Sequence, residues 1–199
     1  MVRILQDHSG QHMSRFLPAL EEKGVLRWLA SDEGDLMLED TKAWDRFRGE
    51  VREDEAIEQK FAWHFAAPPF RSLFDYRTRT SSSGASLSGA IPELARATDL
   101  YIKCKSLGPR CLIQHGHSTW IEAESVGSDF WVNQNVTIGW ANGGRPRIGN
   151  NVVVRTGAVV VGNVEIGDGV RIFANAVVGT DVPKNSNVYP ARSVIVPRR

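Results

Sequence analysis

The feature that most constrains this chain is a short repeat of aliphatic residues in its C-terminal half. An aliphatic residue recurs every six positions there, with one longer step between Ile138 and Ile148. The repeated positions are Val126, Val132, Ile138, Ile148, Val154, Val160, Ile166, Ile172 and Val178. Neither the period of an α-helix nor the alternation of a long strand produces this rhythm. A fixed short period indicates stacked units, none of which buries its apolar face alone.

Glycine or asparagine follows many of these aliphatic residues, as at Gly127, Asn133 and Gly139. Three such units per turn make a triangular coil, in which the aliphatic residue points inward and glycine or asparagine turns the corner with a positive φ. The rhythm and these residue types resemble the hexapeptide-repeat superfamily, whose fold is a left-handed parallel β-helix. The left hand comes from the resemblance, because ordinary parallel crossovers are right-handed.

Composition narrows the class of partner and the compartment. The chain has 199 residues and a net charge of +1, so nothing indicates a nucleic-acid or acidic-surface binder. No apolar run is long enough to span a membrane or to serve as a secretory signal. The two cysteines, Cys104 and Cys111, form no disulfide framework and are expected to be reduced thiols. We therefore expect a cytoplasmic protein.

Two regions are expected. Residues 1–90 are predicted to be α-helical, and the aromatic-rich stretch 61–76 is expected to pack against the repeat or a neighbouring subunit rather than bind a ligand. The small residues Ser81–Ser86 are interpreted as a linker. Residues 91–199 are predicted to form the β-helix, which gives a mainly β protein with a small helical preface.

The first coil of the repeat is irregular and carries two histidines. Val126 follows Ile113 by one residue more than two six-residue units, and His115 and His117 lie within this interval. An irregularity in a repeat indicates a site or a cap. A histidine that merely caps a corner is the structural alternative for His115.

The segments Leu112–Thr119 and Trp131–Gly139 together resemble the serine acetyltransferase branch of the superfamily. The resemblance implies acetyl transfer from acetyl-CoA to a hydroxyl group, with His115 in the position of the general base. His117 lies two residues further on and is expected to orient His115 or to bind the acceptor. No third histidine follows, so we expect no metal.

The motifs around the acceptor depart from this branch. The family's supporting aspartate has its nearest match in Asp99, one residue too far from His115, and Arg145 stands where the family has a histidine. Glu122 and Glu124 are alternative carboxylate partners for His115. These departures place L-serine in doubt and favour a sugar hydroxyl, with L-serine as the first alternative. A non-catalytic trimeric scaffold is the alternative from another class.

Further site residues follow from the resemblance. The inserted loop Trp140–Arg147 resembles the family's loop over the active-site cleft, although a purely structural insertion fits the pattern equally well. Trp140, Arg145 and Asn133 are expected at the acceptor. The superfamily places acetyl-CoA along a groove between subunits of a homotrimer, and trimers of this branch can pair further. The positions that match the cofactor groove here are Thr156, Gly157, Ala158, Ala174, Asn175 and Arg192.

Overall fold

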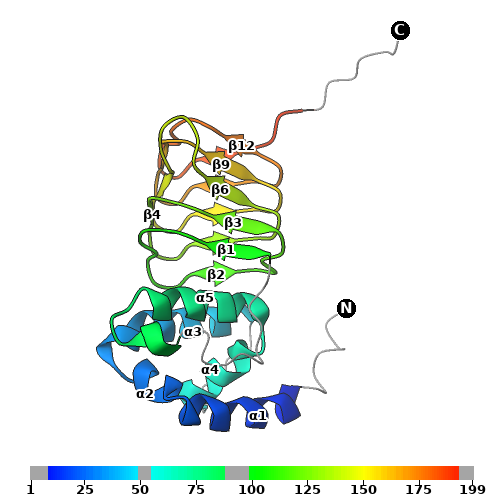
Figure 1. Ribbon diagram of the computed structural model, residues 1–199. Helices are drawn as coiled ribbons and strands as arrows, with labels where there is room; N and C mark the ends of the chain where they lie inside the picture. Colours follow the sequence, from blue (N-terminus) through cyan, green and yellow to red (C-terminus); the bar gives the residue numbers. More distant parts are fainter. Residues whose placement is uncertain (1–8, 49–54, 88–98, 193–199) are drawn as a thin grey trace.

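The computed structural model describes residues 9–48, 55–87 and 99–192, and consists of a helical region stacked on one end of a β-helix (Figure 1). The predicted boundary at residues 90 and 91 lies outside the described residues. The helices are α1 (Ser9–Glu22), α2 (Val25–Leu29), α3 (Asp35–Arg48), α4 (Ile57–Phe65) and α5 (Pro68–Arg79), with short 3₁₀ helices η1 (Asp32–Gly34) and η2 (Gly84–Leu87).

Local signals in the sequence account for the helix ends. Gly24 separates α1 from α2 and has a φ of 75°. Glycine adopts such a positive φ at little cost, because it has no Cβ atom. Pro68 opens α5, where its fixed φ suits the first turn, and Arg77 and Arg79 lie in the last turn, where positive charge is favoured.

The interpretation of Ser81–Ser86 as a linker is wrong. Gly84–Leu87 forms η2, and the Gly84 N–H donates a hydrogen bond of 2.9 Å to the Ser81 hydroxyl. Both the N–H and the hydroxyl of Ser83 donate to the Glu33 carboxylate at 2.8 Å. These small polar residues therefore fold back against the helices, because Glu33, distant in sequence, accepts their hydrogen bonds.

The strands form three parallel sheets that run along the faces of a triangular coil. Sheet A contains β1 (Leu100–Ile102), β3 (Thr119–Ile121), β6 (Thr137–Gly139), β9 (Val159–Val161) and β12 (Val177–Val178). Sheet B contains β4 (Ser125–Val126), β7 (Arg147–Ile148) and β10 (Glu165–Ile166). Sheet C contains β2 (Leu112–Ile113), β5 (Trp131–Val132), β8 (Val153–Val154), β11 (Arg171–Ile172) and β13 (Asn187–Val188). This arrangement confirms the left-handed parallel β-helix that the sequence predicts.

The register confirms that the repeated aliphatic residues stack inside the coil. In sheet A, Ile121 pairs with Ile138 and Ile138 pairs with Val160, and all three are at most 1% exposed. Sheet C repeats the arrangement with Val132, Val154 and Ile172. The full burial of each such side chain contributes about 1.5–3 kcal/mol to the free energy of unfolding. The stacked aliphatic residues are therefore the main source of stability of the β-helix.

The aromatic-rich stretch forms the core of the helical region. Phe61 and Phe74 have ring centroids 5.8 Å apart, and Phe65 and Phe74 lie 5.2 Å apart edge to face. Trp44 packs on Phe70 and donates a hydrogen bond of 2.9 Å from its indole to the Cys111 carbonyl in the first coil. The cluster therefore packs mainly among the helices and reaches the β-helix at its edge.

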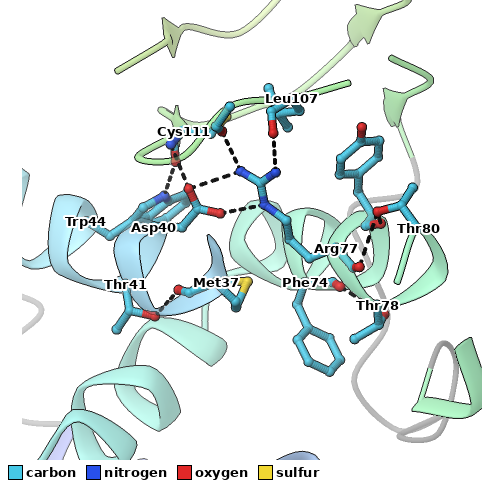
Figure 2. A network of polar contacts seen from close by, with 12 residues as sticks. Met37, Asp40, Thr41, Trp44, Phe74, Arg77, Thr78, Thr80, Leu107 and Cys111 are labelled. Atoms are coloured by element: carbon cyan, nitrogen blue, oxygen red, sulfur yellow. Dashed lines mark hydrogen bonds and ion pairs between the residues drawn. The ribbon is translucent and has the colours of Figure 1, made fainter. Parts of the chain in front are cut away.

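A buried ion pair joins the helices to the first coil (Figure 2). The Arg77 Nε donates to an Asp40 oxygen at 2.8 Å, and the two side chains are 3% and 0% exposed. The same guanidinium donates to the carbonyls of Leu107 and Gly108, and Asp40 accepts the Cys111 N–H at 2.7 Å. Burial is the largest single influence and lowers the pKa of Arg77, but the charge and the hydrogen bonds of Asp40, with smaller effects of Cys111 and Tyr76, together outweigh it. The pKa is therefore raised and the guanidinium stays charged. The pair therefore satisfies backbone groups that the end of the β-helix would otherwise leave buried without partners.

Candidate active site

The two histidines lie on the corner that leads from β2 to β3 in the first coil. Ile121 follows Ile113 by eight positions, whereas Ile138 follows Val132 by six, so this corner holds two extra residues. His115, Gly116 and Ser118 all have a positive φ, of 67°, 68° and 49°. Such a run is rare for residues with side chains and is found at functional sites. Val126 follows Ile121 by only five positions, so the two extra residues and this shorter step together give the net excess of one between Ile113 and Val126.

The corner backbone is held firmly although its histidines are exposed. The His117 carbonyl accepts the Asn135 N–H at 2.8 Å and the Thr119 hydroxyl at 3.0 Å. A Cβ atom on Gly116 would lie 3.1–3.3 Å from side chains of Ile113, Leu100 and Pro69, so the corner packs tightly over the end of α5. His115 and His117 are therefore presented to solvent from a backbone whose position is fixed.

Asp99 lies at the same corner but holds its backbone rather than a histidine ring. One Asp99 oxygen accepts the Ser118 N–H at 2.8 Å and the Ser118 hydroxyl at 3.4 Å. The hydrogen bond from the Ser118 N–H is the main cause that lowers the pKa of Asp99, and the nearby charge of His117 adds to it. Within residues 99–192 no hydrogen bond joins Asp99 to either imidazole. Asp99 is thus placed as a positioning residue for the corner.

Asn133, expected at the acceptor, lies one coil beyond the histidines and contacts Gln114. Its Nδ2 donates to the Gln114 Oε1 at 2.9 Å, and the residue is 7% exposed. Sequence reasoning did not single out Gln114, which the structure brings into contact with Asn133. The signal was its place immediately before His115, at the corner position equivalent to Asn133.

The predicted cofactor residues share the edge of the β-helix on which His115 lies. Thr156–Ala158 follow β8 and Ala174–Asn175 follow β11, so both sets turn the corner from sheet C to sheet A. The N–H groups of Gly157 and Asn175 already donate to the preceding coil, to Gln134 and Thr156. By contrast, the N–H groups of Thr156 and Ala174 have no protein acceptor within the described part of the chain. Arg192 is exposed beyond β13.

Trp140 and Arg145 lie away from His115 within one chain. His115 precedes the strands of sheet A, whereas the loop with Trp140 and Arg145 follows β6, at the opposite end of those strands. The Arg145 guanidinium donates to one Glu122 oxygen at 2.8 and 3.0 Å, and the Trp120 indole donates to the other at 3.1 Å. Glu122 is therefore engaged by Arg145, and Glu124 by Lys105 at 2.6 Å. Trp140 is 61% exposed.

The contact between Glu122 and Arg145 predicts a mild, acid-sensitive effect on stability. The Arg145 hydrogen bond, followed by that of Trp120, lowers the pKa of Glu122 in the folded state. The stabilisation is present above the ordinary pKa of glutamate and is lost as the pH falls through the lowered folded value. Because the pair is partly exposed, we expect Arg145→Ala to cost at most about 1 kcal/mol at pH 7 and less at pH 3. Urea unfolding at both pH values measures this, and a larger cost at pH 3 would contradict it.

Two further properties of the described residues concern metal binding and membrane insertion. No three of their His, Cys, Asp and Glu side chains gather closely enough to hold a metal ion. None of the described helices has the length and apolar character required to cross a bilayer.

Comparison with known protein families and sequences places this chain among the hexapeptide-repeat transferases. Residues 145–180 match the family model described as "Bacterial transferase hexapeptide (six repeats)". The chain is 32% identical over 154 residues to a serine acetyltransferase of Helicobacter pylori, covering 72% of this chain and 90% of that protein. It is 44% identical over 87 residues to one of Synechococcus elongatus, covering 41% and 36%.

Solved structures agree on the fold. A Neisseria gonorrhoeae serine acetyltransferase in complex with serine superposes with a TM-score of 0.60 at 20% identity, over 90% of this chain and 79% of that one. The soybean apoenzyme gives 0.58 at 22% identity, over 92% and 81%. The chain belongs to the serine acetyltransferase branch of the hexapeptide-repeat acyltransferases.

Proposed function

We propose that this protein transfers the acetyl group of acetyl-CoA to the side-chain hydroxyl of L-serine. The observation that carries this proposal is the identity of 32% to a serine acetyltransferase across 90% of that protein's length. A solved serine acetyltransferase of similar fold is complexed with CoA, and another with serine. These names favour serine over the sugar acceptor that the altered motifs indicate.

His115 serves as the general base in this proposal. Its imidazole removes the proton of the serine hydroxyl while the oxygen attacks the thioester carbonyl carbon of acetyl-CoA. A C–O bond forms, the C–S bond breaks, and the imidazolium returns the proton to the departing CoA sulfur. The fixed corner supports this role, because a base must be held in reach of the hydroxyl in one orientation.

The edge that begins at His115 is suited to the pantetheine arm of acetyl-CoA. The free N–H groups of Thr156 and Ala174 follow one another by one coil, with a spacing of about 4.8 Å. An arm that contains two amide carbonyls can accept hydrogen bonds from such donors. The set of predicted cofactor residues is refined in this proposal. Gly157 and Asn175 shape the corners, because their N–H groups are already bonded to the preceding coil, and they offer no donors to the ligand.

A homotrimer with sites between subunits completes the proposal. In one chain the exposed Trp140 and the histidine corner lie at opposite ends of the strands of sheet A, so one chain does not bring them together. A neighbouring copy placed against the edge of sheet A would bring its Trp140 toward the His115 corner. Arg145 then supports the position of the loop and does not contact the acceptor itself, because its guanidinium is bound to Glu122.

The acceptor is tested by release of the CoA thiol from acetyl-CoA with a panel of hydroxyl compounds. We expect L-serine to give the highest kcat/KM, above L-homoserine, glycerol and hexoses. A hexose that exceeds L-serine would contradict the acceptor while leaving acetyl transfer intact. Absence of both acetyl-CoA binding and thiol release would contradict the enzyme proposal and favour a scaffold.

A further inference from the structure

Two stacked aromatic rings lie on the edge where the chain turns from sheet C to sheet A, which is the edge that carries His115. They lie at the end of the β-helix far from the helices. The Phe173 and Tyr189 rings are 4.5 Å apart and nearly parallel, at 18°. Tyr189 is 63% exposed, so one face of its ring rests on Phe173 while much of the residue remains open to solvent. An exposed, ordered aromatic ring that is stacked on one side offers a flat surface for a second planar group.

The register places this stack in line with the histidine corner. The inward residues Ile113, Val132, Val154, Ile172 and Val188 pair in sequence along sheet C. The residues that follow them therefore occupy equivalent positions: Gln114, Asn133, Arg155, Phe173 and Tyr189. Phe173 lies three coils and Tyr189 four coils from the His115 corner, which is about 14 and 19 Å along the axis.

This distance matches the length of the proposed co-substrate. Thirteen bonds separate the sulfur of CoA from its first phosphorus, and an extended chain of that length spans about 15 Å. A ligand whose thioester lies at His115 has only one direction to follow, because the helical region covers the other end of the β-helix (Figure 1). The first phosphorus then falls at the level of Phe173, and the second phosphate and the ribose carry the adenine further along the same edge, toward Tyr189.

The charge of this edge also suits an anionic ligand. At the corners between sheets C and A, the segments 114–118, 133–136, 155–158, 173–176 and 189–192 include no aspartate or glutamate. The carboxylate that does lie on this edge, Asp99, is at the first coil and accepts the Ser118 N–H. The other two edges carry carboxylates, including Glu122 and Asp181 on one and Asp129 and Asp168 on the other. Arg155, one coil before Phe173, lies with its guanidinium 4.3 Å from the Trp131 ring centroid. Within the described chain no carboxylate pairs with Arg155.

We propose that Tyr189, supported by Phe173, forms the stacking platform for the adenine ring of CoA. The proposal rests on the use of acetyl-CoA proposed above and adds the residues that hold its nucleotide end. Adenine presents a flat π-face to the open side of the Tyr189 ring, as bases do on aromatic side chains in nucleic-acid complexes. Tyr189 therefore contributes to affinity for the co-substrate and leaves the reacting atoms untouched.

Calorimetric titration of the full chain with CoA and with 4′-phosphopantetheine, which lacks the adenosine, tests this proposal. We expect Tyr189→Ala to raise the Kd for CoA about tenfold, within the range measured for base stacking on aromatic residues. The Kd for 4′-phosphopantetheine should stay unchanged. Tyr189→Phe should remain within twofold of wild type for both ligands. Val177→Ala shortens a side chain that is 72% exposed on sheet A, in the coil that holds Phe173, and is the matched control that should change neither Kd.

The outcomes separate the two proposals. Equal CoA affinity in wild type and Tyr189→Ala would overturn the platform alone, as would an equal loss for both ligands. If wild type binds no CoA, the proposed function fails together with the platform. Thermal unfolding of each variant shows whether a loss of affinity comes from the site or from the fold.

Discussion

Replacement of His115 by alanine is expected to lower kcat for acetyl transfer by about 10² to 10⁴, the usual contribution of a general base. The side chain is exposed on a corner whose backbone is held by Asn135, Thr119 and Asp99. The change therefore removes the imidazole without removing a packed group. Steady-state thiol release with saturating L-serine and acetyl-CoA measures the effect.

His117→Ala is the matched control, because it removes the same group two residues away on the same corner. We expect a smaller loss, of at most about tenfold in kcat, and a change in the KM for the acceptor if His117 binds it. Thermal unfolding should be the same for both variants within error. A larger loss in His117→Ala than in His115→Ala would reverse the assignment of the base.

Replacement of Arg77 by methionine is expected to lower the free energy of unfolding by about 3–5 kcal/mol. The change leaves the buried Asp40 carboxylate without its counter-charge and the carbonyls of Leu107 and Gly108 without donors. Figure 2 shows Asp40, Arg77 and Leu107 where the helices meet the first coil. Denaturant unfolding followed by circular dichroism measures the loss.

The double variant Arg77→Met/Asp40→Leu separates the charge effect from the backbone effect. It should recover part of the loss, because no buried charge remains, but not all of it, because the carbonyls and the Cys111 N–H keep no partner. A single variant as stable as wild type would contradict the view that this pair joins the two regions.

The β-helix could be predicted from the sequence because its period is written in adjacent residues. Each inward aliphatic residue has its stacking partner a fixed number of positions away, and the corner that breaks this spacing carries His115. The extra length of that corner was visible as the anomalous step from Ile113 to Val126. Local spacing was therefore enough to find both the fold and the histidine corner.

Contacts between distant residues could not be predicted in the same way. Arg77 and Asp40 are 37 positions apart, and Glu33 and Ser83 are 50 apart, with no pattern that links them. Small residues at 81–86 indicate a linker only if nothing accepts their hydrogen bonds, and Glu33 does. Likewise, Arg145 was expected at the acceptor, yet a carboxylate 23 positions away holds it.

The acceptor depends on groups that no short motif encodes. The departures at Asp99 and Arg145 indicated a sugar, whereas the relatives support L-serine. In the structure the Asp99 carboxylate binds the corner backbone at Ser118 and the Arg145 guanidinium binds Glu122, so both side chains have a role in holding the protein itself. Their change therefore carries less information about the acceptor than the altered motifs implied.

The central claim is tested most directly by incubating the protein with acetyl-labelled acetyl-CoA and L-serine and identifying the labelled product by mass spectrometry. We predict O-acetyl-L-serine in an amount equal to the CoA released, formed by wild type and lost in His115→Ala. Acetyl-CoA that stays intact in the presence of L-serine, or label recovered only on another acceptor, would contradict the account.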